Sequence, residues 1–172
     1  MARRTLAIIT TALLALGFAC NSDDDDDPPS SSSTTTSPEA EVEAAYLAFW
    51  DMAVRLAESP DPDDPEIAQR SSGDARTDLV SGLRSLREAN QRTESGPATN
   101  HEVLASEVDG ETAHIDDCAV DESRLVDDST GDTQAEGTTT TRWTVTLKQS
   151  DGEWLVDQFE RVDAWEGVVA CE

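Results

Sequence analysis

The spacing of hydrophobic positions changes near residue 100, which divides the chain into a helical half and a β half. Between residues 38 and 58, apolar side chains recur every three or four positions, and this spacing is typical of an amphipathic helix. Ser37 and Pro38 suit the cap and first turn of such a helix, and the proline-rich segment 60–65 ends it near Glu58. Its predicted apolar face consists of Val42, Tyr46, Phe49, Ala53 and Leu56.

Two further helices are predicted before the β half. Asp64 and Pro65 begin a short helix that runs to Arg70, because they supply a capping side chain and a proline in the first turn. Gly73 interrupts this pattern, and Asp74 is predicted to cap a third helix. The third helix carries Leu79, Leu83 and Leu86 on one face.

From residue 103 onwards, apolar and polar side chains alternate, which predicts β-strands. Asp109-Gly110 is typical of a tight hairpin turn, and the segments 93–100 and 127–137 are predicted as loops. The predicted strands are 103–108, 112–120, 123–126, 140–149 and 154–162. This order predicts an α+β fold in which three N-terminal helices pack on one face of an antiparallel sheet of four to five strands.

The N-terminus has the pattern of an export signal. Arg3 and Arg4 precede an apolar run of about thirteen residues, which is short of the roughly 20 that span a bilayer. Small residues then lead to Cys20, so we predict that residues 1–19 are a signal peptide and that Cys20 becomes a lipidated N-terminus. Cleavage at the same bond without lipidation is the alternative, and either the general or the twin-arginine export route is open.

Residues 20–37 follow with five consecutive aspartates, two prolines and a run of serine and threonine. Such a segment buries little apolar surface, and we predict a disordered tether. Residues 38–172 are predicted to form one domain. A protein of this organisation would be anchored by its lipid at the extracytoplasmic face of the cell membrane.

The net charge of −25 over 172 residues limits the classes of partner that the protein can bind through surface charge. A field of that sign repels nucleic acid and anionic lipid head groups, so we expect neither to be bound through surface charge. The acyl chains on Cys20 would then be the contact with the membrane.

The cysteines predict one disulfide. With Cys20 lipidated, Cys118 and Cys171 remain as a single pair in an oxidising compartment. The bridge would join the C-terminal tail to the second predicted strand. A metal site or catalytic thiol is the alternative, and the preceding Asp116 and Asp117 would disfavour a thiolate at Cys118.

Candidate catalytic groups are few. His101 lies at a junction of loop and strand, and His114 lies in a strand with a parity opposite to that of Ala113 and Ile115, so it is predicted to face solvent. The sequence has no metal-ligand spacing of histidine and cysteine, no phosphate-binding glycine loop and no Ser-His-Asp order. We expect no catalytic residue, no metal and no cofactor.

Several segments together resemble the NTF2-like superfamily as it occurs in actinobacterial lipoproteins. They are the helix with YLAFW at 46–50, the break at 60–65, the DDC at 116–118, the RWTVTL at 142–147 and the DGEWLV at 151–156. The resemblance implies a cone-like fold in which a curved sheet wraps around helices and leaves a pocket. Tyr46, Trp50 and Trp143 would line that pocket, and core packing explains them equally well.

The resemblance is more specific for fold than for function. Some members of the superfamily are isomerases, cyclases or dehydratases that use an Asp-His or Asp-Tyr pair, and many others are non-catalytic binding or spacer domains. We expect a non-catalytic domain that binds a small apolar ligand or an envelope protein. The alternatives are a small isomerase- or hydrolase-type enzyme and a passive envelope spacer, and a homodimer through the exposed sheet face is left open. A histidine or carboxylate inside the pocket would favour the enzyme.

Overall fold

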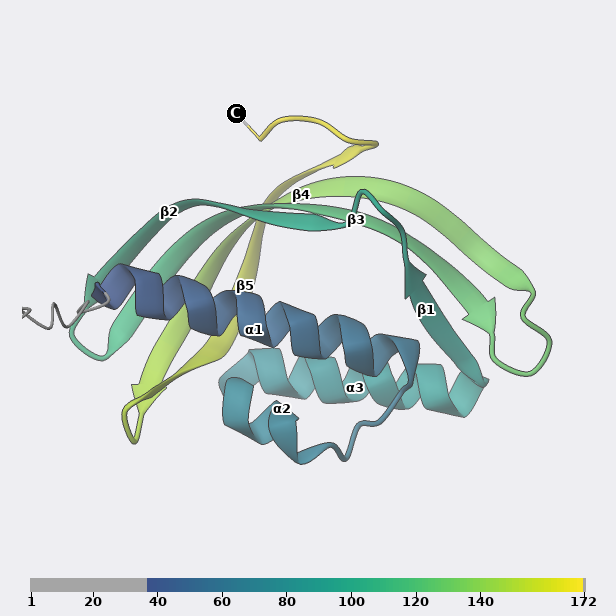
Figure 1. Ribbon diagram of the computed structural model, residues 1–172, viewed down its shortest axis with the longest axis horizontal. Helices are drawn as coiled ribbons and strands as arrows, with labels where there is room; N and C mark the ends of the chain where they lie inside the picture. The colour runs from purple at the N-terminus through teal and green to yellow at the C-terminus, as the bar shows by residue number, and fades with distance from the viewer. Residues whose placement is uncertain (1–36, 172) are drawn as a thin grey trace, which may run out of the picture. The chain divides into compact units, whose positions relative to one another are not determined.

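The computed structural model of the protein describes residues 37–171. The predicted signal peptide, Cys20 and nearly all of the predicted tether lie outside this range. Three helices come first, and five strands follow (Figure 1). The helices are α1 (Pro38–Glu58), α2 (Pro65–Arg70) and α3 (Gly73–Ala89). The strands are β1 (Gln91–Ser95), β2 (Asn100–Asp109), β3 (Thr112–Asp127), β4 (Thr133–Ser150) and β5 (Glu153–Glu166).

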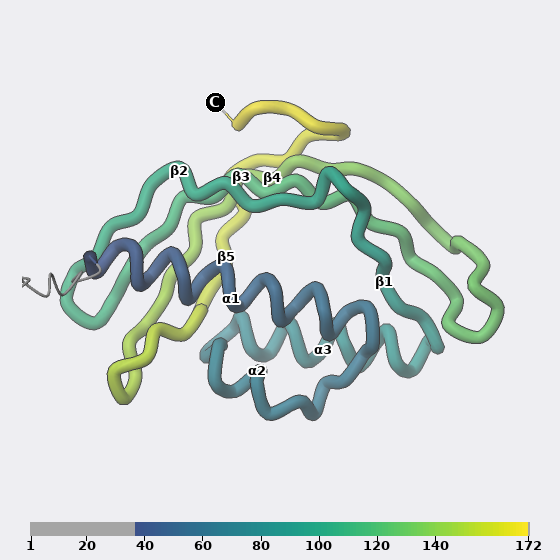
Figure 2. Tube along the Cα trace, viewed as in Figure 1, coloured from purple at the N-terminus to yellow at the C-terminus, as the bar shows by residue number. Residues whose placement is uncertain are grey.

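All five strands belong to one antiparallel sheet, which confirms the predicted α+β class. β3, β4 and β5 are neighbours in sequence order, while β1 and β2 lie one after the other along the same edge of β3. Irregular pairing interrupts the register of β2, β3, β4 and β5, and such bulges bend strands. Figure 2 shows the long strands arching over the helices, so the sheet has a concave face toward the helical layer.

The core lies between that concave face and α1. Every third or fourth residue of α1 is buried, as the spacing predicts. These side chains pack against alternate residues of the sheet, because successive side chains of a strand point to opposite faces. The sheet side of the core consists of Ala113, Ile115, Val145, Leu147 and Val156.

The predicted caps of the first two helices are present. Ser37 accepts a hydrogen bond from the backbone N–H of Ala40, and Asp64 accepts one from Glu66. The third helix begins differently from the prediction: Ser72 occupies the N-cap position, Gly73 is the first helical residue, and Asp74 lies inside the first turn. The reason is a tertiary contact, since the Ser72 hydroxyl donates to Asp157 on β5 at 2.8 Å.

Several strand predictions were wrong in extent, and β5 also continues four residues beyond the predicted end at 162. The segment 93–100, predicted as a loop, contributes the end of β1, and only residues 96–99 leave the sheet. The predicted strands 112–120 and 123–126 are one continuous strand, β3. β4 begins at Thr133, so the predicted loop 127–137 is shorter. Polar residues pair here because the long partner β3 offers backbone hydrogen bonds, whatever the side chains are.

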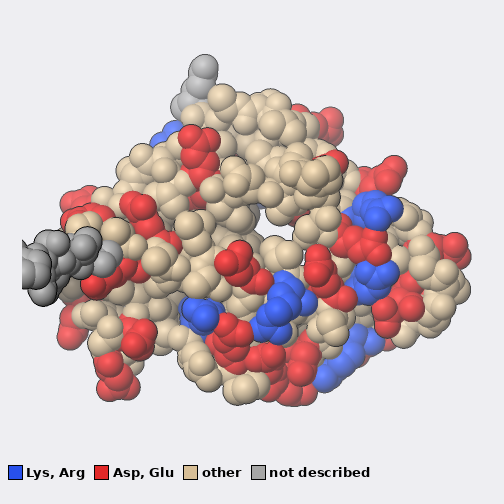
Figure 3. Space-filling view, viewed as in Figure 1, with Lys and Arg blue, Asp and Glu red and all other residues tan. Residues whose placement is uncertain are grey.

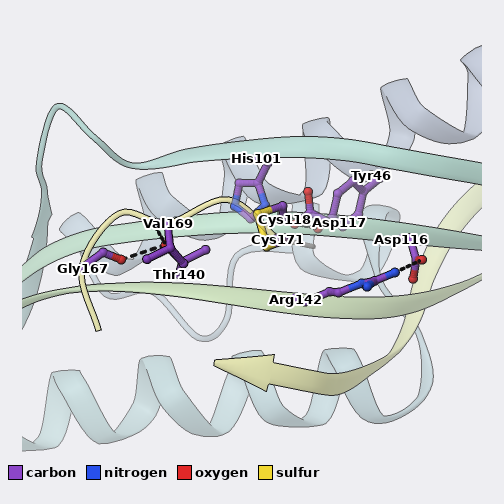
Figure 4. The surroundings of a disulfide bond; sticks show 10 residues. All are labelled: Tyr46, His101, Asp116, Asp117, Cys118, Thr140, Arg142, Gly167, Val169 and Cys171. Carbon is purple, nitrogen blue, oxygen red and sulfur yellow. Dashed lines mark hydrogen bonds and ion pairs between the residues drawn. A yellow bond between two sulfur atoms is a disulfide. The ribbon is translucent and has the colours of Figure 1, made fainter. Parts of the chain in front are cut away.

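The C-terminal tail folds back over the convex face of the sheet and is joined to β3 by the Cys118–Cys171 disulfide (Figure 4). The backbone N–H of Gly167 donates to the Thr138 carbonyl, and the buried Thr140 hydroxyl donates to the Gly167 carbonyl, both at 2.8 Å. The predicted pairing of the two cysteines is therefore present in the structure. Within residues 37–171, no helix is both long and apolar enough to cross a bilayer.

The start of α3 provides a stability prediction. Gly73 has φ of +50°, and a Cβ there would lie 2.5 Å from Asp157 Oδ1 and 2.9 Å from the Asp157 carbonyl oxygen. Gly73→Ala is expected to lower the free energy of unfolding by about 1–3 kcal/mol, measured by urea denaturation. Gly82→Ala is the matched control, because an added Cβ there would meet nothing within 4 Å beyond the neighbouring backbone of its own helix, and it is expected to stabilise the protein by about 0.5–1 kcal/mol. Equal effects would contradict the steric explanation.

Candidate functional site: a cavity between the helices and the sheet

A cavity of about 480 Å³ lies between the helices and the concave face of the sheet. Figure 3 shows an opening between the helical layer and the sheet on the viewed face. The helices contribute apolar side chains to its lining, namely Trp50, Ala53, Val54, Ala57 and Leu79. The strands and the 96–99 connection contribute Thr93, Ser95, Thr99, His101, Ala119, Val120, Asp121, Ser123, Thr139, Thr141 and Trp143.

The lining has two chemically different sides. The helical side is apolar throughout, whereas hydroxyl-bearing residues from β1, β3 and β4 dominate the sheet side. These residues face inward because they share the parity of the buried strand positions: Ser123 and Asp121 continue the row that Ala119 begins on β3. A cavity with an apolar wall and a polar wall suits an amphipathic molecule better than a purely apolar one.

Three polar side chains meet beside this cavity, and one of them, His101, lines it. The buried Asp117 on β3 accepts two hydrogen bonds at one oxygen, Oδ2: 2.7 Å from the Tyr46 hydroxyl on α1 and 2.8 Å from His101 Nδ1 on β2. Figure 4 shows these side chains beside the disulfide. The other carboxylate oxygen, Oδ1, is buried and accepts no hydrogen bond from residues 37–171. The cluster thus ties the helical layer to two strands through one carboxylate.

Asp117 fixes the orientation of the His101 ring. Because a carboxylate oxygen accepts hydrogen bonds, the contact assigns the ring proton to Nδ1 and leaves Nε2 as an acceptor in the neutral ring. The Trp50 ring stacks on the His101 ring with centroids 4.3 Å apart, and the Tyr46 ring meets its edge at 5.9 Å. His101 lines the cavity, so this arrangement can accept a hydrogen bond or a proton from a bound molecule.

Tyr46 belongs to the cluster and not to the cavity lining. Burial raises the pKa of the Tyr46 hydroxyl far above its ordinary value, and the charge and hydrogen bond of Asp117 raise it further. Tyr46 is therefore a neutral donor that holds Asp117 in place over the physiological pH range.

In the described part of the chain, the lining of the cavity carries one acidic side chain, Asp121, and no lysine or arginine. An adjoining hollow shares Trp50 and His101 with the cavity and includes Arg55. The Arg55 guanidinium is already paired with Glu66 at 2.6 Å and lies 3.7 Å from Asp64.

The sequence-predicted residues are placed as follows. Trp50 and Trp143 line the cavity, whereas Tyr46 is completely buried one turn before Trp50 and is directed to Asp117. His114 is exposed on the opposite face of β3, as its parity predicts. Among residues 37–171, no group of three or more histidine, cysteine, aspartate or glutamate side chains could hold a metal ion.

Sequence reasoning missed the Asp117–His101 pair and Asp121. A signal for both aspartates was present, because they share the parity of Ala113 and Ile115 and should face inward with them. The partnership of His101 with Asp117 had no such signal. It depends on the register between β2 and β3, in which His101 lies opposite Ala119.

Comparison with known proteins gives structural neighbours only. No model of a known protein family matches the sequence, and no curated protein matches it. The intermembrane space region of the chloroplast protein ARC6 matches with a TM-score of 0.57 and 14% identity, over 74% of this chain and 98% of that one. A SEC-C motif-containing protein from Rhodopseudomonas palustris has a TM-score of 0.38 and 17% identity, over 74% of this chain and 80% of that one.

An NTF2-like protein with a cystatin-like fold from Novosphingobium aromaticivorans has a TM-score of 0.40 and 16% identity, over 70% of this chain and 80% of that one. At 14% identity the ARC6 match shows the fold alone: helices packed on a curved antiparallel sheet.

Proposed function

We propose that the protein is an extracytoplasmic, NTF2-like binding domain that holds a small amphipathic molecule in the cavity between its helices and its sheet, and does not transform it. Lipid on Cys20 would anchor it at the outer face of the cell membrane. A solved neighbour of the same fold, the ARC6 region, comes from an intermembrane space, so the fold occurs outside the cytosol elsewhere.

The observation that carries this proposal is the lining of the cavity. Its volume of about 480 Å³ falls within the range of roughly 300–1,000 Å³ found for ligand pockets. Two tryptophans and a helical wall of small apolar residues suit the body of a ligand, and the strand hydroxyls suit its polar groups. A spacer domain would have no need of such a cavity, since filling it would stabilise the fold.

Filling the cavity should abolish binding. Ala57 lines the cavity from α1, and Ala57→Phe is expected to weaken binding of the neutral probe N-phenyl-1-naphthylamine by at least about tenfold. Ala44→Phe adds the same ring to an exposed position of the same helix and is expected to leave the affinity unchanged. Probe fluorescence measures both affinities, and similar values for the two variants would contradict binding in this cavity.

The anchor has its own test. Cys20→Ser removes the acceptor of the acyl chains, and the protein is expected to move from the membrane fraction to the soluble fraction. Intact mass of the native protein should correspond to residues 20–172 plus acyl chains. A Cys20→Ser protein that stays wholly in the membrane fraction would contradict the lipid anchor.

A second function, an acid–base enzyme of the isomerase or hydrolase type, is favoured by the Asp117–His101 pair. A carboxylate that orients a histidine ring beside a cavity is an arrangement that can move a proton. The two functions differ in the fate of the ligand. Small molecules extracted from the native protein and added back should be recovered unchanged from a binding protein. Conversion that is lost in His101→Gln would instead establish the enzyme.

A further inference from the structure

We infer that the ligand of this cavity is an organic cation: an apolar or aromatic body that carries a protonated amine, with the amine bound at Asp121. This inference rests on the proposed binding function and specifies the chemistry of the ligand. The observations that support it are the position of Asp121, the lining hydroxyls that form no hydrogen bond with the described chain, the lack of a lysine or arginine among the described lining residues and the two tryptophans.

Asp121 lies on the inner row of β3, directly opposite Thr139 of β4 and two residues from Ser123. No described residue forms a hydrogen bond or an ion pair with its carboxylate. The side chain is exposed, so water hydrates it when the cavity is empty, and the fold needs no counter-charge there. An ammonium group can therefore replace water at this carboxylate without disturbing an existing contact.

Hydroxyl groups share the sheet side of the cavity with this carboxylate, and Thr139 lies directly opposite it. Thr99 is already engaged, because its hydroxyl donates to the Glu122 carbonyl. The other lining hydroxyls form no hydrogen bond with residues 37–171, and they belong to Thr93, Ser95, Ser123, Thr139 and Thr141. A protonated amine has up to three N–H donors, so these oxygens can accept those that Asp121 does not.

The charges of the lining exclude an anion and favour a cation. Two adjoining hollows contain arginines, and carboxylates already engage both: Asp64 and Glu66 pair with Arg55, and Glu94 pairs with Arg124. An anionic group would meet Asp121 with no compensating positive charge, and the net charge of −25 would oppose its approach. The negative electrostatic field of the protein raises the concentration of cations near its surface.

The tryptophans complete the site. Trp50 and Trp143 line the cavity from α1 and β4, and indole faces attract cations as well as apolar surface. The apolar helical wall, with Ala53, Val54 and Leu79, can cover the body of the ligand while its amine lies at the sheet side. A molecule that carries a polar, positive group at one end of an apolar body can thus contact both walls of the cavity at once.

Three probes with one naphthalene skeleton test the inference: 1-naphthylmethylamine, 1-naphthalenemethanol and 1-naphthaleneacetate. Calorimetric titration at neutral pH would use the full chain with Cys20→Ser, so that no detergent competes for the probes. The amine is expected to bind about fivefold more tightly than the alcohol, and the carboxylate more weakly than both. Asp121→Asn should abolish the preference for the amine and leave the affinity for the alcohol unchanged.

Asp109→Asn is the matched control, because it removes the same charge from an exposed hairpin turn away from the cavity and is expected to keep the preference. Equal affinities for amine and alcohol, or equal losses of preference in the two variants, would overturn the inference while binding itself stands. If none of the three probes binds, the proposed binding function fails, and this inference fails with it.

Discussion

Replacing Cys118 or Cys171 with serine is expected to lower the free energy of unfolding by about 4 kcal/mol in either variant. The two cysteines are 53 residues apart, and a bridge over that separation strongly restricts the unfolded chain. The bridge also holds the C-terminal tail on the convex face. There the Thr140 hydroxyl donates to the Gly167 carbonyl and accepts a hydrogen bond from the Val169 N–H. Urea denaturation of each single variant measures the loss.

The double variant provides the control. Because either substitution removes the whole bridge, the double variant should lose about as much stability as each single one. Reduction of the wild-type protein should produce the same shift in the midpoint of unfolding. Strongly unequal losses in the two single variants would contradict the prediction that the Cys118–Cys171 bond provides this stabilisation.

Removing the carboxylate of Asp117 is expected to cost about 3–5 kcal/mol, measured as the free energy of unfolding of Asp117→Ala. The Tyr46 hydroxyl and His101 Nδ1 both donate to the same oxygen, so its loss leaves two donors without an acceptor in the core. Asp116→Ala is a matched control on the neighbouring residue, where the partners Arg142 and Thr144 are partly exposed, and should cost about 1 kcal/mol or less. Similar losses at both positions would contradict a central role for the buried cluster.

The same cluster predicts how stability depends on alkaline pH. Burial first, and then Asp117, raises the pKa of Tyr46 in the folded state, whereas the unfolded tyrosine titrates near its ordinary value of about 10. Above that pH the unfolded state loses a proton that the folded state keeps, so stability should fall by about 1.4 kcal/mol per pH unit. Below pH 10 the contribution of Tyr46 is constant.

Tyr46→Phe isolates this effect, because Tyr46 is the only tyrosine of the chain. The variant should lose about 1–3 kcal/mol at neutral pH, since Asp117 loses one donor, and its stability should decline less steeply above pH 10. Near-ultraviolet absorbance of the wild-type phenolate should appear only as the protein unfolds. A phenolate that forms near pH 10 in the folded protein would contradict the burial and pairing of Tyr46.

Much of the fold was predictable because, along the first helix and the long strands, the apolar residues that the sequence spacing places on one face are the residues that the fold buries. The spacing from Val42 to Leu56 predicts the buried face of α1, and the alternation around Val145 and Leu147 predicts the inner face of β4. The predictions failed where polar residues enter the sheet, at 93–95 and 133–139, because backbone pairing with β3 stabilises these strands whatever their hydrophobicity.

The candidate site was predictable only in part. The sequence predicts Trp50 and Trp143 as pocket-lining residues. It predicts the same for Tyr46, but the helical spacing of Tyr46 is equally consistent with a place in the core. The contact with Asp117 decides between these roles, and a sequence does not state which strand lies beneath a helix.

By itself, the sequence determined the helical and β halves, the caps of α1 and α2, and the strongly acidic charge, and it predicted the pairing of Cys118 with Cys171 on the condition that Cys20 is lipidated. These depend on local spacing, composition and counting. Only the tertiary structure decided that His101 meets Asp117, that Asp121 faces a cavity and that hydroxyls line the same cavity. Those features depend on strand register and on the curvature of the sheet, which arise from interactions between residues far apart in the chain.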